Sequence, residues 1–287
     1  TQGYSSAASD VYKRQVKKAM NIFITLDSNY IYPLCVMLNS IAETNSGNRI
    51  DLYVAYSSLT ENDFSDMEKA LGMTNHEIHR IPVSDDMFDG CPVLDRISKA
   101  TYYRLLAGDV LPNDVERVLY LDPDIVINGD LSDFYNLDLQ GNIIAGAPHL
   151  YGIPEGVNRL RLGLSKGSRY INAGVLLIDL KKWREEISLK RIFKFISVNH
   201  KKLLLADQDV INALMKNRTL PIDERVYNLD EKTYRHFSSC FAGERKIDLE
   251  WVEKNTVIIH FNGKKKPWKE QKYTGRLGDF FEKYKLL

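Results

Sequence analysis

The sequence has no apolar run long enough to cross a membrane as a helix. Such a helix needs about 20 consecutive apolar residues, and charged or polar residues interrupt every apolar stretch of this 287-residue chain before that length. No basic segment followed by an apolar core stands near its start, so we expect no export signal. These absences predict a cytoplasmic protein without a membrane span.

Cysteine and net charge are also scarce, and each absence excludes a class of protein. The three cysteines, Cys35, Cys91 and Cys240, have neither the close pairing of a zinc site nor the spacing of a disulfide framework. We therefore expect buried, reduced thiols. The formal net charge is only +1, which gives no general reason to bind nucleic acid.

The residues that are present suit one large domain. Residues 1–18 are small, polar and aperiodic, and we expect them to be foreign to the fold. We expect strands over residues 21–26, 51–55, 79–83, 118–121, 125–127, 143–147, 175–179 and 256–259. We expect helices over residues 30–45, 60–71, 98–107 and 188–217. This alternation predicts an α/β fold with a doubly wound, mostly parallel sheet, and the Gly-rich segment 149–169 is expected to be a functional loop.

Two carboxylates, Asp122 and Asp124, end the apolar run that begins at Arg117. Residues i and i+2 of a strand point to the same face, so the two side chains converge. At the carboxyl end of a strand, where open α/β sheets bind ligands, they suit a divalent metal that also holds phosphate oxygens. A second pair, Asp207 and Asp209, lies in a helical pattern that separates its carboxylates by about 200°.

Other polar residues near the expected strand ends each allow a functional and a structural interpretation. Asp27 and Asn29 follow the first strand and either contact a nucleotide or cap the next helix. Arg104 shares a helical face with Ile97 and Thr101, and reaches either a phosphate or a structural carboxylate.

Three later segments carry further candidates of the same kind. Asn172 and the small residues after it suit either sugar recognition or a simple turn. Asp207 and Gln208 stand at the start of a helical pattern, where capping alone would explain the acid. His260 follows a strand and either completes a metal shell or is a structural residue.

The end of the chain is basic and aromatic. Gly263 and Lys266 follow His260 and either contact a diphosphate or belong to a solvated loop. Residues 264–287 contain eight Lys or Arg, three acids and five aromatic residues. This composition predicts either peripheral contact with an anionic membrane at its inner face or a terminal helix that packs Phe280 and Phe281 inward.

Four motifs, in their order along the chain, resemble glycosyltransferase family 8, most closely its bacterial lipooligosaccharide galactosyltransferase type. They are Leu121-Asp-Pro-Asp124 after Arg-Val-Leu-Tyr, Asn172-Ala-Gly-Val-Leu-Leu-Ile-Asp-Leu-Lys-Lys-Trp183, Asp207-Gln-Asp209 and His260-x-x-Gly-x-x-Lys-Pro-Trp268. The resemblance implies a glycosyltransferase domain over residues 19–268, of the nucleotide-diphospho-sugar transferase (GT-A-like) type, followed by a basic aromatic tail at 269–287.

The resemblance also implies an activity and a set of site residues. The activity is the retaining transfer of galactose or glucose from a UDP-sugar to a glycan or lipid-linked acceptor, with Mn²⁺, or Mg²⁺ in its place. Asp122, Asp124 and His260 are the implied metal ligands. The implied donor-binding positions are Thr25, Asp27, Asn29, Tyr30, Ile97, Arg104, Asp122, Pro123, Asp124, Asn172, Ala173, Asp207, Gln208, His260, Gly263 and Lys266.

The implied reaction needs a group that stabilises an oxocarbenium-like anomeric carbon. The side-chain oxygen of Gln208 and the carboxylate of Asp207 are the candidate catalytic groups. The chain departs from the pattern of this type at two positions, because Arg96 stands in place of a histidine on the uridine side and the acceptor-facing aspartate falls near Leu150. The acceptor therefore stays open.

Three other functions remain open. Asp122-Pro-Asp-Ile-Val126 fits the signature of haloacid dehalogenase-type phosphohydrolases, although that signature belongs at the end of a first strand. A sugar nucleotidyltransferase would need a glycine-rich phosphate loop, and Asp27-Ser-Asn-Tyr30 contains no glycine. A catalytically silent sugar-nucleotide-binding protein is the third alternative.

Overall fold

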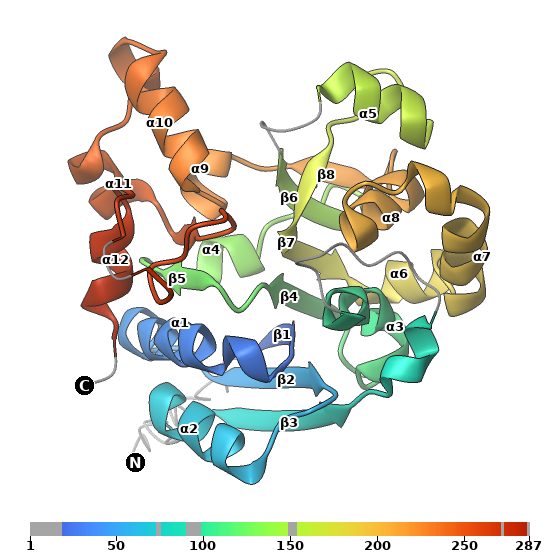
Figure 1. Ribbon diagram of the computed structural model, residues 1–287, viewed down its shortest axis with the longest axis horizontal. Coiled ribbons are helices and arrows are strands. Elements are labelled where there is room, and N and C mark those ends of the chain that lie inside the picture. Colours follow the sequence, from blue (N-terminus) through green and yellow to red (C-terminus); the bar gives the residue numbers. More distant parts are fainter. Residues whose placement is uncertain (1–18, 73–75, 90–98, 149–153, 271–272, 286–287) are drawn as a thin grey trace, which may run out of the picture.

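Helices cover both faces of a central seven-stranded sheet in the computed structural model, which describes residues 19–72, 76–89, 99–148, 154–270 and 273–285 (Figure 1). The strands are β1 (Met20–Leu26), β2 (Ile50–Tyr56), β3 (Glu77–Pro82), β4 (Arg117–Leu121), β5 (Ile125–Ile127), β6 (Ile144–Pro148), β7 (Ile171–Asp179), β8 (Thr219–Pro221) and β9 (Ile258–His260). The predicted α/β architecture with a mostly parallel sheet is confirmed.

The helices differ widely in length. They are α1 (Ile31–Thr44), α2 (Glu61–Leu71), α3 (Ala107–Val110), α4 (Ser132–Tyr135), α5 (Glu155–Leu162), α6 (Leu180–Glu186), α7 (Leu189–Asn199), α8 (Ala206–Leu214), α9 (Glu224–Tyr227), α10 (Glu231–Ser239), α11 (Leu249–Asn255) and α12 (Gly278–Lys283). Short 3-10 helices occupy Ser28–Tyr30, Asp85–Phe88, Lys99–Leu106, His200–Lys202 and Gly243–Arg245.

One strand of the central sheet is antiparallel to both of its neighbours. This reversal determines which residues meet at the edge of the sheet that contains Asp122. The strand order is β3-β2-β1-β4-β7-β6-β8, and β7 is antiparallel to both β4 and β6. The amino end of β7 therefore lies beside the carboxyl end of β4. Leu121 pairs with Val175, and the backbone N–H of Asp122 donates to the carbonyl of Gly174 at 2.8 Å.

A second, two-stranded sheet brings the end of the domain to the same edge. β5 pairs antiparallel with β9, so that Ile125 lies opposite His260. The N–H of Phe261 donates to the carbonyl of Asp124 at 2.9 Å. The backbone alone thus places an imidazole beside the carboxylate pair.

The sheet separates two apolar layers because successive strand residues point to opposite faces. In β4, Leu119 and Leu121 pack into the layer that contains α1 and α2. Val118 and Tyr120 pack into the other layer, with α6, α8 and the 3-10 helix Lys99–Leu106. Asp122 comes two residues after Tyr120, so its side chain points to the same face of the sheet as that of Tyr120.

Several sequence predictions hold in detail, and one about cysteine does not. Thr60 caps α2 in a capping box with Asp63, and Gly72 ends that helix at a left-handed φ of 67°. Cys35 is buried, and burial raises its thiol pKa to about 12. Cys240 is exposed, which corrects the expectation of buried thiols, and Cys91 lies outside the described residues.

The predicted strand 175–179 was too short. β7 begins at Ile171, so Asn172 and Ala173 lie within a buried central strand and not in a turn before it. The small and polar residues at its start have low strand propensity, which masked the strand. Pairing with β4 on one side and β6 on the other overrides that propensity.

Three other predicted segments also differ from the structure. The helix expected over 98–107 is a 3-10 helix over Lys99–Leu106 followed by α3. The expected loop 149–169 contains α5, whose buried Asn158 and Leu162 are one turn apart. The expected helix 188–217 is divided into α7, a 3-10 turn and α8.

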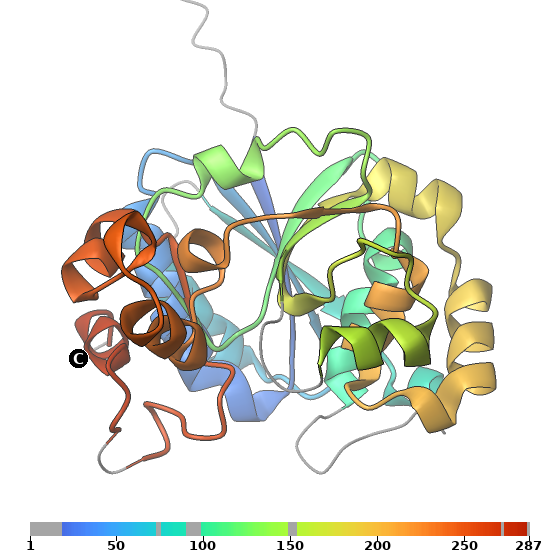
Figure 2. The ribbon, with the colours of Figure 1, turned by 90° about the horizontal axis from the view of Figure 1, so that it is seen from above.

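The C-terminal tail packs against the domain. α10, α11 and α12 gather beside α1, on the opposite side of the molecule from α5, α7 and α8 (Figures 1 and 2). Leu277, Phe281 and Tyr284 are buried with Phe261, and the rings of Phe281 and Trp268 lie 5.4 Å apart. This is the inward packing expected of Phe281. No helix within the described part of the chain combines the length and hydropathy that a membrane span requires.

We predict that Phe281→Ala destabilises the protein by about 3–5 kcal/mol, because it removes a fully buried ring from the tail's apolar cluster. Chemical denaturation would measure this, with Lys264→Ala, an exposed position, as the control. An unfolding free energy equal to that of the wild type would contradict the packing of the tail.

Candidate active site

Asp122, Asp124 and His260 meet at the carboxyl edge of the sheet. Their possible ligand atoms all lie within 4.8 Å of one another. The imidazole Nε2 is 3.0 Å from Asp124 Oδ1 and 3.7 Å from Asp122 Oδ2. Neighbouring ligands of one ion with bonds of about 2.1 Å are separated by about 3 Å, so the three side chains fit one divalent cation. Asp124 and His260 are 7% and 2% exposed, whereas Asp122 is more open.

Gly174 makes room for this cluster. A Cβ on Gly174 would overlap with Asp122 Oδ2 and with the Cε1 atom of His260, and would lie 3.0 Å from Asn172 Oδ1. Its φ is not in the left-handed region, so conformational freedom is not what requires glycine here. The requirement is space for the carboxylate and the imidazole.

Two cations, Lys266 and Arg104, balance the negative charges of the site, and Lys266 is paired with Asp124. Lys266 Nζ lies 2.6 Å from Asp124 Oδ2 and donates to the carbonyl of Phe261 at 2.7 Å. Burial alone would raise the pKa of Asp124, but the neighbouring Lys266 ammonium outweighs it and holds that pKa well below its usual range. Asp124 is therefore an anion whose charge is already compensated.

Arg104 joins three parts of the site. Its guanidinium lies 3.0 Å from Asp122 Oδ1 and 2.9 Å from Asp207 Oδ2, and donates to the carbonyl of Ala173 at 2.6 Å. Burial, with a smaller contribution from Asp122, raises the pKa of Asp207 to about 7 despite this arginine. The expected contact of Arg104 with a structural carboxylate is thus present.

The hydroxyl groups of Thr25 and Tyr120 form a hydrogen-bonded chain that ends at Asp122. Tyr120 donates to Asp122 Oδ1 at 2.7 Å, so the Thr25 hydroxyl, 3.0 Å away, donates to the Tyr120 oxygen. Arg104 also lies over the Tyr120 ring, 4.6 Å from its centroid. Tyr120 was not among the predicted site residues, although its position two residues before Asp122 in a strand was a usable signal.

Gln208 is held at the start of α8, beside Ala173 of β7. Its Oε1 accepts from the Ala173 N–H at 3.2 Å, and its Nε2 donates to the Tyr170 hydroxyl at 3.1 Å. Tyr170 in turn donates to Asp209 Oδ1 at 2.6 Å. Asp209 is fully buried and accepts two hydrogen bonds from Arg161. The two carboxylates of the Asp207-x-Asp209 pair thus bind different arginines, which fits the separation expected for them in a helix.

The residues expected at the nucleotide lie along the same edge. Asp27 accepts from the Asn29 N–H at 2.9 Å, which is the capping interaction named as the alternative. Burial, then Asp124 and Asp122, raises the pKa of Tyr30 to about 12, so this ring stands near the carboxylate pair. Gly263 is exposed. Ile97 lies outside the described residues, as do Arg96 and Leu150.

Asn228 is a site residue that no pattern in the sequence pointed to. Its Oδ1 lies 2.8 Å from His260 Nδ1, and its Nδ2 donates to Asn172 Oδ1 at 3.1 Å. It precedes β9 by some 30 residues and follows the short helix α9. No periodic pattern connects such a position to a metal ligand.

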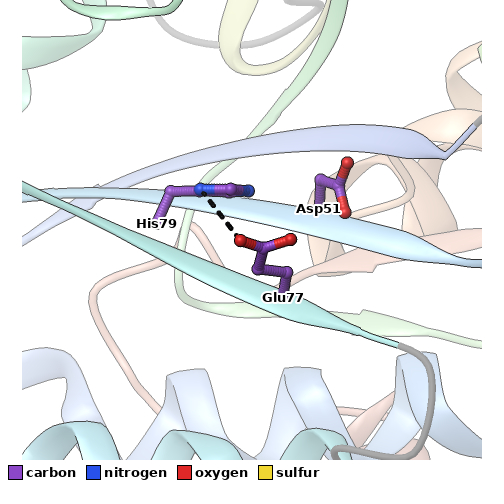
Figure 3. A group of neighbouring side chains, drawn as sticks. All are labelled: Asp51, Glu77 and His79. Atoms are coloured by element: carbon purple, nitrogen blue, oxygen red, sulfur yellow. Dashed lines mark ion pairs between the residues drawn. The ribbon is translucent and has the colours of Figure 1, made fainter.

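A second group of metal-ligating residue types lies at the amino edge of the sheet. Asp51 and Glu77 are paired across β2 and β3, and His79 stands beside them (Figure 3). Arg49 already lies 3.1 Å from Asp51 and 3.2 Å from Glu77. A guanidinium therefore occupies the place of a cation there, and the triad at the carboxyl edge is the better metal site.

A polar cavity also opens away from the triad. Its volume is about 740 Å³, and Asn21, Arg117 and Asp179 are among its lining residues. It shares no residue with the cluster around Asp122. The candidate active site is therefore assigned from the carboxylates and the imidazole, and not from the size of this cavity.

A model of glycosyl transferase family 8 matches residues 21–272. The chain belongs to this family. The crystal structure of the galactosyltransferase LgtC in complex with donor and acceptor sugar analogues superposes on this family 8 glycosyltransferase with a TM-score of 0.80 and 27% identity, over 92% of this chain and 95% of that one. An active-site mutant of LgtC gives a TM-score of 0.81 over the same shares.

Curated relatives are similar over most of this family 8 glycosyltransferase. Lipopolysaccharide 1,2-glucosyltransferase of Escherichia coli K12 is 28% identical, over 88% of this chain and 73% of that protein. Lipopolysaccharide 1,3-galactosyltransferase of Salmonella typhimurium is 24% identical, over 86% of this chain and 72% of that protein. Against the glycosyltransferase GlyF of Streptococcus pneumoniae, at 25% identity, 86% of this chain matches only 57% of that protein.

We predict that Gly174→Ala lowers the affinity of the triad for a divalent cation by about tenfold or more, the lower limit for disturbing the support of metal ligands. The added methyl displaces Asp122 and His260. Isothermal titration with Mn²⁺ measures the change, and Gly156→Ala, whose Cβ would meet nothing within 4 Å, is the matched control. Equal affinity in the wild type and Gly174→Ala would contradict this geometry.

Proposed function

We propose that this protein transfers glucose or galactose from a UDP-sugar to a saccharide or lipid-linked glycan acceptor, with retention at the anomeric carbon and with Mn²⁺, or Mg²⁺, held by Asp122, Asp124 and His260. The convergence of these three side chains carries the proposal. The names of the E. coli and S. typhimurium relatives support a hexose donor and a glycan acceptor.

The charges around the triad suit a departing diphosphate. A divalent ion held by Asp122, Asp124 and His260 would supply Lewis-acid stabilisation for the charge that develops on the leaving group. Lys266 adds a fixed cation beside Asp124, and preorganised charges of this kind stabilise a transition state without reorganisation. We propose that Lys266 and Gly263 contact the diphosphate, and that Asp27, Asn29 and Tyr30 contact the uridine.

Gln208 is the better candidate for stabilising the anomeric carbon. Asp207 is already paired with Arg104, whose Nε lies 2.9 Å from its Oδ2. Gln208 Oε1 accepts one hydrogen bond from Ala173 and keeps a second lone pair. We propose that this lone pair faces the carbon from which UDP departs, and that Asp207 acts mainly through Arg104.

The basic and aromatic residues near the C-terminus bear on how the protein would approach a membrane-bound acceptor. Its aromatic residue Phe281 is committed to internal packing. Lys264, Lys265 and Lys269 are exposed close to Lys266. We propose that any peripheral contact with anionic lipid is made by these ammonium groups near the site and not by insertion of aromatic rings.

Family membership removes the phosphohydrolase and nucleotidyltransferase alternatives, and leaves a catalytically silent binding protein as the rival. The discriminating experiment is a screen of UDP-glucose and UDP-galactose for Mn²⁺-dependent hydrolysis and transfer. UDP binding without turnover of either donor would favour the silent protein. Turnover of one donor would support the proposed transferase and identify its hexose.

We predict that Asp122→Asn and Asp124→Asn each abolish Mn²⁺-dependent turnover. Each change keeps the size of the side chain and removes the negative charge that a divalent ion requires. UDP release at increasing Mn²⁺ concentrations measures the effect. Asp66→Asn, an exposed position that pairs with Lys69 on α2, is the control, and near-normal transfer by either site variant would refute the metal assignment.

We predict that Gln208→Ala lowers kcat by about 100-fold while UDP-sugar affinity is mostly kept, because the lost group acts in the transition state. Steady-state kinetics and direct titration with the donor separate the two quantities. Asn217→Ala, an exposed position beyond α8, is the control. An unchanged kcat would remove Gln208 from the chemistry.

A further inference from the structure

We propose that Asn228 is a positioning residue that fixes the ring proton of His260 on Nδ1 and turns the Asn172 amide nitrogen toward the donor sugar. It would thereby join the metal ligands to the sugar contacts. The parts that concern metal and sugar rest on the proposed function, whereas the position of the ring proton does not.

A backbone donor fixes the whole network. The N–H of Gly174 donates to the Asn172 side chain at 2.8 Å, and a backbone N–H can only donate, so the accepting atom is the amide oxygen. That oxygen also faces Asn228, which must therefore present its NH2 group at 3.1 Å. The remaining Asn228 oxygen then faces His260 Nδ1 at 2.8 Å. Each amide orientation follows from the one before it.

The same chain of donors settles which nitrogen of His260 can bind a metal. A neutral imidazole has one ring proton, and Asn228 Oδ1 and Asp124 Oδ1, at 2.8 and 3.0 Å, compete for it. With the proton on Nδ1, the Nε2 lone pair points toward Asp122 and Asp124. With the proton on Nε2, the ring would be a hydrogen-bond donor to Asp124 and could not be a ligand. Asn228 favours the ligand form.

The backbone places Asn228 for this role. The N–H of Leu229 donates to the carbonyl of Ile258 at 3.0 Å, and the N–H of His260 donates to the carbonyl of Leu229 at 2.8 Å. Asn228 is thus locked beside β9, and it is only 6% exposed. A ligating histidine whose second nitrogen is held in this way keeps its ring orientation before the ion arrives.

Asn172 is oriented by the same contacts. Its Oδ1 is occupied by Gly174 and Asn228, so it cannot accept from a sugar hydroxyl in this arrangement. The Nδ2 group is what it offers to a ligand. We infer that Asn172 recognises the donor sugar as a hydrogen-bond donor to a hydroxyl oxygen.

Two substitutions separate the two halves of the proposal. Asn228→Leu removes both contacts, and we expect Mn²⁺ affinity to fall about 10- to 100-fold. Asn228→Asp keeps the acceptor for His260 Nδ1 and loses the donor to Asn172. We expect it to bind Mn²⁺ within about threefold of the wild type but to bind UDP-sugar about tenfold more weakly relative to UDP, the loss of about 1.4 kcal/mol.

The control is Asn128→Ala. Asn128 is half-buried and donates to three carbonyls at the end of α11, away from the triad. It should lower stability and leave Mn²⁺ affinity unchanged. Wild-type Mn²⁺ affinity in Asn228→Leu would overturn the role of Asn228 at the metal. An unchanged ratio of UDP-sugar to UDP affinity in Asn228→Asp would overturn its role at the sugar.

The ring proton can also be located without any variant. Side-chain ¹⁵N shifts of His260 in the wild-type protein without added metal distinguish the two neutral tautomers. A proton on Nδ1 supports the proposal, and a proton on Nε2 overturns it even if neither Asn228 variant folds. Should the wild type carry the proton on Nδ1 yet bind no Mn²⁺, the proposed function would fail and the role of Asn228 in setting the tautomer would stand.

Discussion

The repulsion between three carboxylates at one sheet edge is the constraint on which the site depends. Asp122, Asp124 and Asp207 are brought together by elements that pack for other reasons, and burial strengthens their repulsion. Arg104 bridges Asp122 and Asp207, while Lys266 holds Asp124. Even with these two cations, the edge still presents several carboxylate oxygens that can act as metal ligands. The possible ligand atoms of Asp122, Asp124 and His260 can therefore still receive a divalent cation.

Much of this edge could be predicted because it follows strand periodicity. The alternation of apolar runs identifies β1 and β4, and the spacing of Asp122 and Asp124 places both carboxylates on one face. His260 follows a short apolar run, so its place at a strand end was readable too. Periodicity does not show that β5 and β9 pair with each other. This pairing joins the predicted carboxylate pair and the separately predicted His260 into one cluster.

The unpredicted features depend on contacts between segments far apart in the chain. The reversal of β7 determines that Asn172 and Gly174 meet Asp122, and nothing local in the sequence specifies a strand's direction. The glycine is needed for a clash that exists only after His260 arrives. Asn228 reaches its partner through a single backbone bridge between Leu229 and Ile259. Such positions become visible only when the tertiary structure is known.

The pairing of Asp124 with His260 across 136 positions has a consequence for synthesis. At about 5–20 residues per second, a ribosome needs roughly 7–27 s to travel from the carboxylates to the imidazole. During that interval the emerging polypeptide exposes acidic groups without their histidine or Lys266. The three side chains are thus brought together only after most of the sheet has been synthesised.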